Sequence, residues 1–252
     1  MKAIRFLSLL LALLLAVSFV ACKDDPADNT DPNTDPEAGT TPTDPTEEPS
    51  NSLAATGAIG DGPLTWELYK DGTLYIKGQG SMADFITGAE EGKSQQPWYS
   101  YIGNASSVTV KKVVVEDGVT ALSELAFKNC INLQRAELGA GIKDIPRECF
   151  VNCSSLQYVV AKNAVTVQDV AFQNCVALKR VTLSASLQTV WDGAFHNAAT
   201  QSADFAVRLA GTQAEWEAAK AAMDASESDE LAIWGGNDAL LGALEAPIFV
   251  EK

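Results

Sequence analysis

A five-residue motif recurs four times in the second half of the chain, and it limits the possible folds more than any other feature. The copies occupy residues 126–130, 149–153, 171–175 and 194–198, each with Phe in second and Asn in fourth place. Their phenylalanines, 23, 22 and 23 residues apart, are Phe127, Phe150, Phe172 and Phe195. Self-similarity at a fixed period of roughly 20–50 residues indicates a solenoid, whose stacked units share one continuous core. We therefore expect an α/β repeat solenoid with these four phenylalanines in its core.

Other apolar columns keep step with the motif. One column precedes the phenylalanines and comprises Val119, Ile142, Val165 and Leu187. The third unit is one residue shorter than the others, and the pattern places the missing residue between Val165 and Phe172. Pairs of apolar residues two apart, such as Val113 with Val115, predict one short strand per unit with one face inward. The motif itself fits a helical turn, with Asn in the left-handed conformation where the turn stops.

The repeats need a cap at each end, because a terminal unit would otherwise expose its core. Asp71-Gly72 between two alternating segments predicts a β-hairpin. Thr212 and Glu215 have the spacing of a capping box, which predicts a helix reaching about Asp224. We divide the folded part into an N-terminal β cap at 51–110, four repeats of 22–23 residues at 111–200 and a C-terminal cap at 201–252.

The N-terminus has the features of an export signal. Lys2 and Arg5 precede an apolar run at 6–20, which is too short to span a bilayer as a helix. Val20-Ala21-Cys22 resembles the lipobox of bacterial lipoproteins, which predicts a signal peptide at 1–21 and lipid on Cys22. The alternative is an ordinary signal peptide with Cys22 as a stray thiol. The following Lys23-Asp24-Asp25 resembles a tag for export to the outer cell surface.

Residues 22–50 predict a disordered acidic tether between the lipid and the folded part. Asp-Pro recurs four times in it, and residues 23–50 carry nine acidic side chains against Lys23 alone. Almost nothing in it is apolar, so no burial could offset the entropy lost on ordering it. The whole chain has a net charge of −15. This charge excludes a general nucleic-acid binder, which needs clustered Lys and Arg.

The repeats resemble the BspA-like leucine-rich-repeat family of bacterial surface proteins. Residues 119–122 and 126–130 follow that family's unit, with Asn in place of its Gly, and residues 64–82, 97–99 and 210–216 resemble its flanking segments. Together with the lipobox and the export tag, the repeats predict an outer-membrane lipoprotein, exposed at the cell surface, with a monomeric domain that binds or adheres to other molecules. The family resemblance implies host matrix proteins or other cells as the targets. The alternative is an accessory or scaffold lipoprotein of a surface complex such as glycan uptake machinery.

Candidate chemistry is sparse. His196 stands in the variable slot of the last motif, without an orienting partner in its pattern. Three cysteines recur in one repeat column and one in a neighbouring column: Cys130, Cys153, Cys175 and Cys149. This recurrence favours small buried core residues, with a disulfide as the alternative. We expect no catalysis, cofactor or metal site.

One outward column of the predicted strands is a candidate ligand-binding stripe. It comprises Lys112, Arg135, Tyr158 and Arg180, and the next outward column is Val114, Glu137, Val160 and Thr182. Neighbouring strands lie about 4.8 Å apart, so the first column would form a basic, tyrosine-containing stripe on an acidic protein. It could bind an acidic protein segment or an anionic glycan. Alternatively, it is only a solvated sheet face.

Overall fold

The computed structural model describes residues 52–60, 62–82, 85, 96–103, 106–226, 233 and 236–252. The predicted signal peptide, Cys22 and the acidic tether lie outside the described residues. Within the described part, no helix is long and apolar enough to cross a bilayer.

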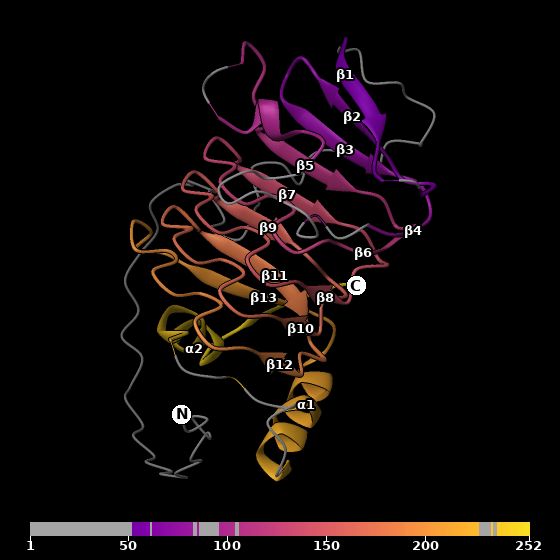
Figure 1. Ribbon diagram of the computed structural model, residues 1–252. Helices are drawn as coiled ribbons and strands as arrows, with labels where there is room; N and C mark the ends of the chain where they lie inside the picture. Colours follow the sequence, from indigo (N-terminus) through magenta and orange to yellow (C-terminus); the bar gives the residue numbers. More distant parts are fainter. Residues whose placement is uncertain are drawn as a thin grey trace, which may run out of the picture. The chain divides into compact units, whose positions relative to one another are not determined.

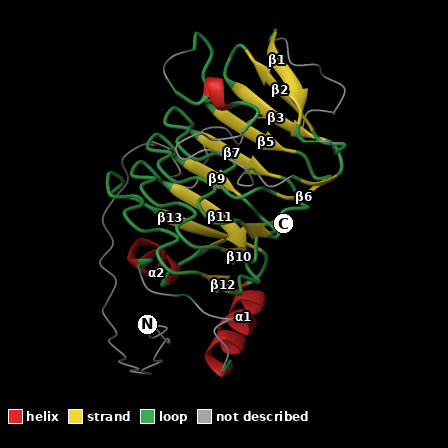
Figure 2. Cartoon of the chain, viewed as in Figure 1, coloured by secondary structure: helices red, strands yellow, loops and turns green. Residues whose placement is uncertain are grey.

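A nine-stranded sheet organises the fold (Figures 1 and 2). Its first three strands are antiparallel and all later neighbours pair in parallel. In spatial order the strands are β1 (Leu53–Ala58), β2 (Thr65–Tyr69), β3 (Thr73–Lys77), β5 (Lys112–Val115), β7 (Arg135–Leu138), β9 (Tyr158–Val160), β11 (Arg180–Ser184), β13 (Ala206–Ala210) and β14 (Ile248–Val250). The solenoid predicted from the repeats, with its row of short parallel strands, is confirmed.

Shorter elements lie between and beyond these strands. A three-stranded parallel sheet joins β8 (Asp144–Ile145), β10 (Thr166–Val167) and β12 (Thr189–Val190), and a two-stranded sheet joins β4 (Gly80–Ser81) and β6 (Val119–Ala121). A 3-10 turn, η1, spans Tyr99–Tyr101. The helices are α1 (Gln213–Ala225) and α2 (Asp238–Leu244).

The N-terminal hairpin is formed by β2 and β3 as predicted. The turn between them contains Gly72 with φ +92°, a conformation that glycine adopts without steric cost. The Thr73 amide donates to the Asp71 carboxylate at 2.7 Å and fixes the turn. At the other end, the capping box of α1 is also confirmed, because Glu215 N–H donates to Thr212 Oγ1 and Thr212 N–H to Glu215 Oε2.

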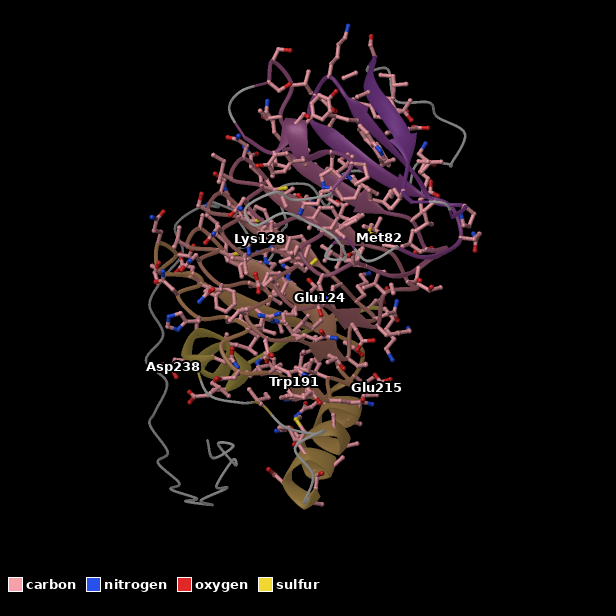
Figure 3. All side chains as sticks on the ribbon, viewed as in Figure 1. Met82, Glu124, Lys128, Trp191, Glu215 and Asp238 are labelled. Atoms are coloured by element: carbon pink, nitrogen blue, oxygen red, sulfur yellow. The ribbon has the colours of Figure 1, made fainter. Side chains whose placement is uncertain are left out.

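The four repeat phenylalanines form one continuous stack through the core. Phe127, Phe150 and Phe172 have no exposed surface and Phe195 has 2%. Successive ring centroids lie 5.3, 5.3 and 5.0 Å apart, with interplanar angles of 22°, 3° and 28°. Trp98 extends the stack at its N-terminal end, 5.6 Å from Phe127, and its Nε1–H donates to the Ala126 carbonyl at 3.0 Å. Figure 3 shows the side chains that fill the space between the coils.

The motif is not the helical turn that we predicted. Positive φ occurs at the asparagine of each copy, Asn129, Asn152, Asn174 and Asn197, and at the residue just before each copy, Leu125, Glu148, Val170 and Gly193. Positive φ ends a right-handed helix, so each motif is a pair of tight turns. Alternate amides bond sideways, as Phe127 N–H does to the Cys149 carbonyl of the next coil, while those between them close turns within the coil, as Lys128 N–H does to the Leu125 carbonyl.

The left-handed asparagines, in contrast, are confirmed and form a ladder. Each Nδ2 donates to the Oδ1 of the preceding rung, from Asn152 to Asn129 at 2.9 Å, Asn174 to Asn152 at 2.8 Å and Asn197 to Asn174 at 2.9 Å. Asparagine tolerates this backbone conformation better than other non-glycine residues. Its side chain therefore both permits the turn and links consecutive coils.

The predicted apolar column that precedes the phenylalanines is wrong at its third member. Ala164 is fully buried in the place of Ile142 and Leu187, whereas Val165 is half-buried. The Ala164 amide bonds to the Ala161 carbonyl, as the Ile142 amide bonds to that of Gly139. The shorter unit therefore lacks its residue in the turn before Ala164. Valine is the more apolar neighbour, which is why the sequence pattern favoured it.

The parallel sheet continues beyond the fourth motif. β13 places Val207 and Leu209 inward, 1% and 0% exposed, in register with Val181 and Leu183.

Asn237 closes the last coil of the solenoid. In the first three units the motif phenylalanine's amide donates to a backbone carbonyl of the next coil, but Phe195 N–H donates to Asn237 Oδ1 at 2.8 Å. Asn237 Nδ2 donates to the Trp191 carbonyl at 2.9 Å, so one side chain replaces backbone that a further unit would supply.

We predict that Asn237→Leu lowers the free energy of unfolding by about 2–4 kcal/mol, because a buried donor and acceptor lose their partners. Asn237 itself has no exposed surface. Denaturant unfolding would measure the loss. The neighbouring exposed residue supplies the control, since Asp238→Asn should change stability by less than about 0.5 kcal/mol. Equal effects of the two changes would contradict the capping role.

Candidate ligand-binding surface

The predicted stripe is assembled on the sheet. Lys112, Arg135, Tyr158 and Arg180 are consecutive register partners on β5, β7, β9 and β11. The next residue of each strand points the other way and is buried, with 0–1% exposure for Val113, Ala136, Val159 and Val181. The four stripe residues therefore lie side by side on the outer face, as the alternation predicted. Whether they bind a ligand stays a prediction.

Tyr158 is held between two arginines. The guanidinium carbons of Arg135 and Arg180 lie 5.9 and 5.8 Å from the centre of its ring. A guanidinium over each face of an aromatic ring is attracted by the ring's negative face. This stack orders the three side chains without a ligand. The two guanidinium groups approach the ring from the strands on either side of β9.

Glu137 reduces the positive charge at the N-terminal end of the stripe. Its Oε1 lies 2.6 Å from Arg135 Nε and 3.1 Å from Lys112 Nζ. Burial raises the pKa of Glu137, but the hydrogen bonds and charges of Arg135 and Lys112 outweigh this effect and hold the pKa below its ordinary value. Glu137 is therefore an anion near neutral pH. The stripe is a mixed network at this end and not uniformly basic.

The second outward column gives the face a different character. Val114, Glu137, Val160, Thr182 and Arg208 are register partners in it. Both valines are half-buried, and Thr182 is only 5% exposed although it lies on the outer face. Apolar side chains thus lie directly beside the arginine–tyrosine stack.

Sequence reasoning missed Arg208, because it follows the fourth motif and no further motif marks its unit. The alternation of Val207 and Leu209 was the available signal. With Arg208, the two outward columns carry four cationic side chains, Lys112, Arg135, Arg180 and Arg208, and one acidic one, Glu137. Their net positive charge contrasts with −15 for the whole chain. The asymmetry would attract acidic partners to this face.

The strands that carry this surface belong to the repeats, and the repeats match a known family model. The model of the BspA type leucine-rich repeat region matches residues 103–209, in six copies. This region belongs to the BspA-type leucine-rich repeat family. The predicted resemblance and the solenoid fold are thereby confirmed, and the match includes β13, beyond the fourth motif.

Two solved structures resemble the BspA-type solenoid described here. One is a leucine-rich repeat protein from Eubacterium ventriosum, with 20% identity, a TM-score of 0.42 and coverage of 57% of this chain. The other is a leucine rich cell surface protein from Faecalibacterium prausnitzii, with 20% identity, a TM-score of 0.40 and coverage of 65%. The matches span 41% of each of those chains. No curated protein sequence matches this one.

The cysteines of the BspA-type repeats are free thiols in the core. Cys130, Cys149, Cys153 and Cys175 have no exposed surface and form no disulfide. The Sγ atoms of Cys153 and Cys175 donate to the carbonyls of Phe127 and Phe150 at 3.1 and 3.2 Å. Burial raises the pKa of all four thiols well above the ordinary range. They are packing residues and not nucleophiles.

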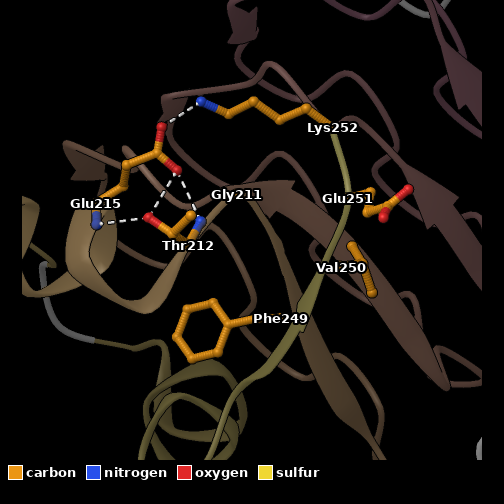
Figure 4. A pocket seen from close by; sticks show the side chains of 7 residues that line it. All are labelled: Gly211, Thr212, Glu215, Phe249, Val250, Glu251 and Lys252. Atoms are coloured by element: carbon orange, nitrogen blue, oxygen red, sulfur yellow. Dashed lines mark hydrogen bonds and ion pairs between the residues drawn. The ribbon is translucent and has the colours of Figure 1, made fainter.

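No catalytic or metal-binding arrangement emerges from the described residues. His196 is exposed and lines a shallow hollow with Asn197, Gly236 and Asp238. No group of three or more His, Cys, Asp or Glu side chains is placed to hold a metal in that part of the chain. A second hollow lies beside the start of α1, lined by Phe249 and by Glu215, which pairs with Lys252 at 2.6 Å (Figure 4). Glu215 and Lys252 thus pair with each other, and Glu251 also lines this hollow.

Proposed function

We propose that this protein is a surface lipoprotein, anchored through lipid on Cys22, whose solenoid binds another protein through the outer face of strands β5 to β13. It acts by binding and not by catalysis. The observation that carries this proposal is the Arg135–Tyr158–Arg180 stack, a preordered cationic surface on a rigid sheet of an acidic protein. Solenoids form extended binding surfaces in this way, because successive units present the same position.

The favoured partner is a protein segment that combines acidic and apolar side chains. Arginine can bind carboxylates through two parallel hydrogen bonds. Val114 and Val160, beside the stack, offer apolar contact that a sulfated or uronic-acid glycan would not need. Tyr158 is the one aromatic side chain of the stripe, and two guanidinium groups lie near its ring, so the stripe offers no row of aromatic platforms for sugar stacking.

We predict that the combined variant Arg135→Ala, Tyr158→Ala, Arg180→Ala weakens binding at least tenfold. The probes are immobilised matrix proteins, an acidic peptide alternating Glu with Val, and heparin. Parent binding to the peptide should weaken with added salt, because exposed charges are screened beyond about 8–10 Å near physiological ionic strength. Surface plasmon resonance would report the affinities.

A matched control tests whether binding depends on this face or only on the net charge of the protein. Arg147→Ala with Lys220→Ala also removes two cations, but from sites outside the stripe, and should leave affinity unchanged. Equal binding by the stripe variant and the parent would reduce the stripe to a solvated face. Preference for heparin over every protein probe would instead point to a glycan ligand. Capture of another bacterial surface protein would favour the accessory role over adhesion.

Anchoring is tested separately. We predict that Cys22→Ala abolishes lipid attachment, so that the chain accumulates as precursor or leaves the membrane fraction. Metabolic labelling with a radioactive fatty acid and cell fractionation would measure both. The matched control is Cys175→Ala, which removes a core thiol and should leave labelling intact. Unchanged labelling of Cys22→Ala would remove the lipoprotein assignment. Proteolysis of intact cells would then show whether the domain faces outward.

A further inference from the structure

Two strands end the nine-stranded sheet, and their free edges differ. At the C-terminal end, β14 has only three residues and is followed at once by Glu251 and Lys252. Short length and adjacent charges are devices by which proteins prevent an edge from pairing. At the N-terminal end, β1 has six residues, Leu53–Ala58, with neither charge nor proline among them. Its edge is therefore open to another strand, although a bulge at Leu53/Ala55 confines regular pairing to its second half.

The hydrogen bonds of β1 show which of its backbone groups face outward. The Ile59 amide donates to the Leu64 carbonyl at 2.9 Å, and Gly57 is the register partner of Trp66. In an antiparallel pair, alternate residues direct both N–H and C=O to the partner. Gly57 and Ile59 therefore bond β2, whereas the backbone groups of Thr56 and Ala58 point away from it. In the part of the chain that the structure describes, nothing pairs with these outward groups.

We infer that two copies of this protein pair through β1, antiparallel and about a twofold axis at Gly57. This register places Thr56 opposite Ala58 of the second copy, and symmetry repeats the pair, which gives four backbone hydrogen bonds. Gly57 then faces its own copy with Cα atoms about 4.5 Å apart, the close spacing of a pair that is not hydrogen-bonded. An antiparallel strand pair is self-complementary, as a twofold interface requires.

Charge and exposure near β1 permit this contact between two acidic chains. On the neighbouring strands β2 and β3, Glu67 and Lys77 neutralise each other at 2.8 Å. Leu53 is 48% exposed at the start of β1, and Thr56 and Ala58 are exposed as well. The dimer departs from the monomeric domain that the sequence suggested. It would join two outer faces in one continuous sheet, so that a partner with several acidic segments would gain from multivalency.

The test uses the full chain, expressed together in two versions with different C-terminal affinity tags. After mild extraction from membranes, purification through one tag should recover the other version. Thr56→Pro should reduce this recovery at least tenfold, because it removes an outward N–H while leaving the β1–β2 bonds intact. Thr56→Ala is the matched control. It also loses the side-chain bond to the Trp66 carbonyl, at 2.8 Å, but should pair as the parent does.

Absence of co-recovery in the parent would overturn the inference, and so would equal recovery of Thr56→Pro and the parent. If Thr56→Pro fails to fold, Thr56→Lys decides, since it keeps the backbone N–H and places a charge on the edge. Pairing of Thr56→Lys at the parent level would also overturn it. None of these outcomes depends on ligand binding, which the stripe variant tests by itself.

Discussion

Phe150→Ala is expected to lower the free energy of unfolding by about 3–5 kcal/mol, the usual loss for a buried phenylalanine. Phe150 is fully buried and its ring lies 5.3 Å from both Phe127 and Phe172. Truncation therefore removes two aromatic contacts and leaves a cavity between two coils. Denaturant unfolding followed by circular dichroism would measure the loss.

Position in the stack supplies the control for this prediction. Phe195 contacts only one ring of the stack, that of Phe172, so Phe195→Ala should cost less than Phe150→Ala. The damage at Phe150 should also spread, since each unit of a solenoid is stabilised by its neighbours. Hydrogen exchange would then show lost protection on both sides of the variant coil. A melting temperature within a degree of the parent's would contradict the role of the stack.

The periodic part of this fold could be predicted from sequence because each unit solves the same packing problem. Phe, Asn and the inward strand residues recur, and recurrence in register identified the core and the outward stripe. The error at Val165 arose where the period slips, since local hydrophobicity favours Val over the buried Ala164. The turn was misjudged because residues such as Leu125 and Val170 adopt a positive φ that their side chains do not favour.

The ends of the solenoid could not be predicted in the same way. Asn237 acts on Phe195 from 42 residues away, and its side chain replaces backbone atoms, so no column of the repeat contains it. The candidate site shows a similar limit. Alternation placed Arg135, Tyr158 and Arg180 side by side. The sandwich around Tyr158, and the sharing of Glu137 by Arg135 and Lys112, depend on side-chain rotamers that a pattern does not specify.

We predict that alkaline pH destabilises this protein through its four buried thiols. Burial raises the pKa of Cys130, Cys149, Cys153 and Cys175, so the folded chain keeps four protons that an unfolded chain would release. A thiol in an unfolded chain has a pKa of about 8.5. Below that pH the thiols are neutral in both states and their contribution to stability is fully present. Above it only the unfolded state ionises, so stability is lost as pH rises toward the folded pKa.

The expected loss is on the order of 1 kcal/mol per pH unit for each thiol, so four thiols can exhaust the stability of a typical domain by about pH 10–11. Urea unfolding at pH 7, 8, 9 and 10, under reducing conditions, would measure it. The chain offers its own control substitution, because Ala198 replaces cysteine in one repeat column and Ala126, Ala171 and Ala194 replace it in the other. Cys149→Ala should reduce the pH slope by about a quarter, and replacing all four thiols should remove it. Any other change in this pH range is common to parent and variant, so the difference between their curves isolates the thiols. If the unfolding free energies of parent and cysteine variants change in parallel between pH 8 and 10, the thiols can ionise without unfolding the solenoid.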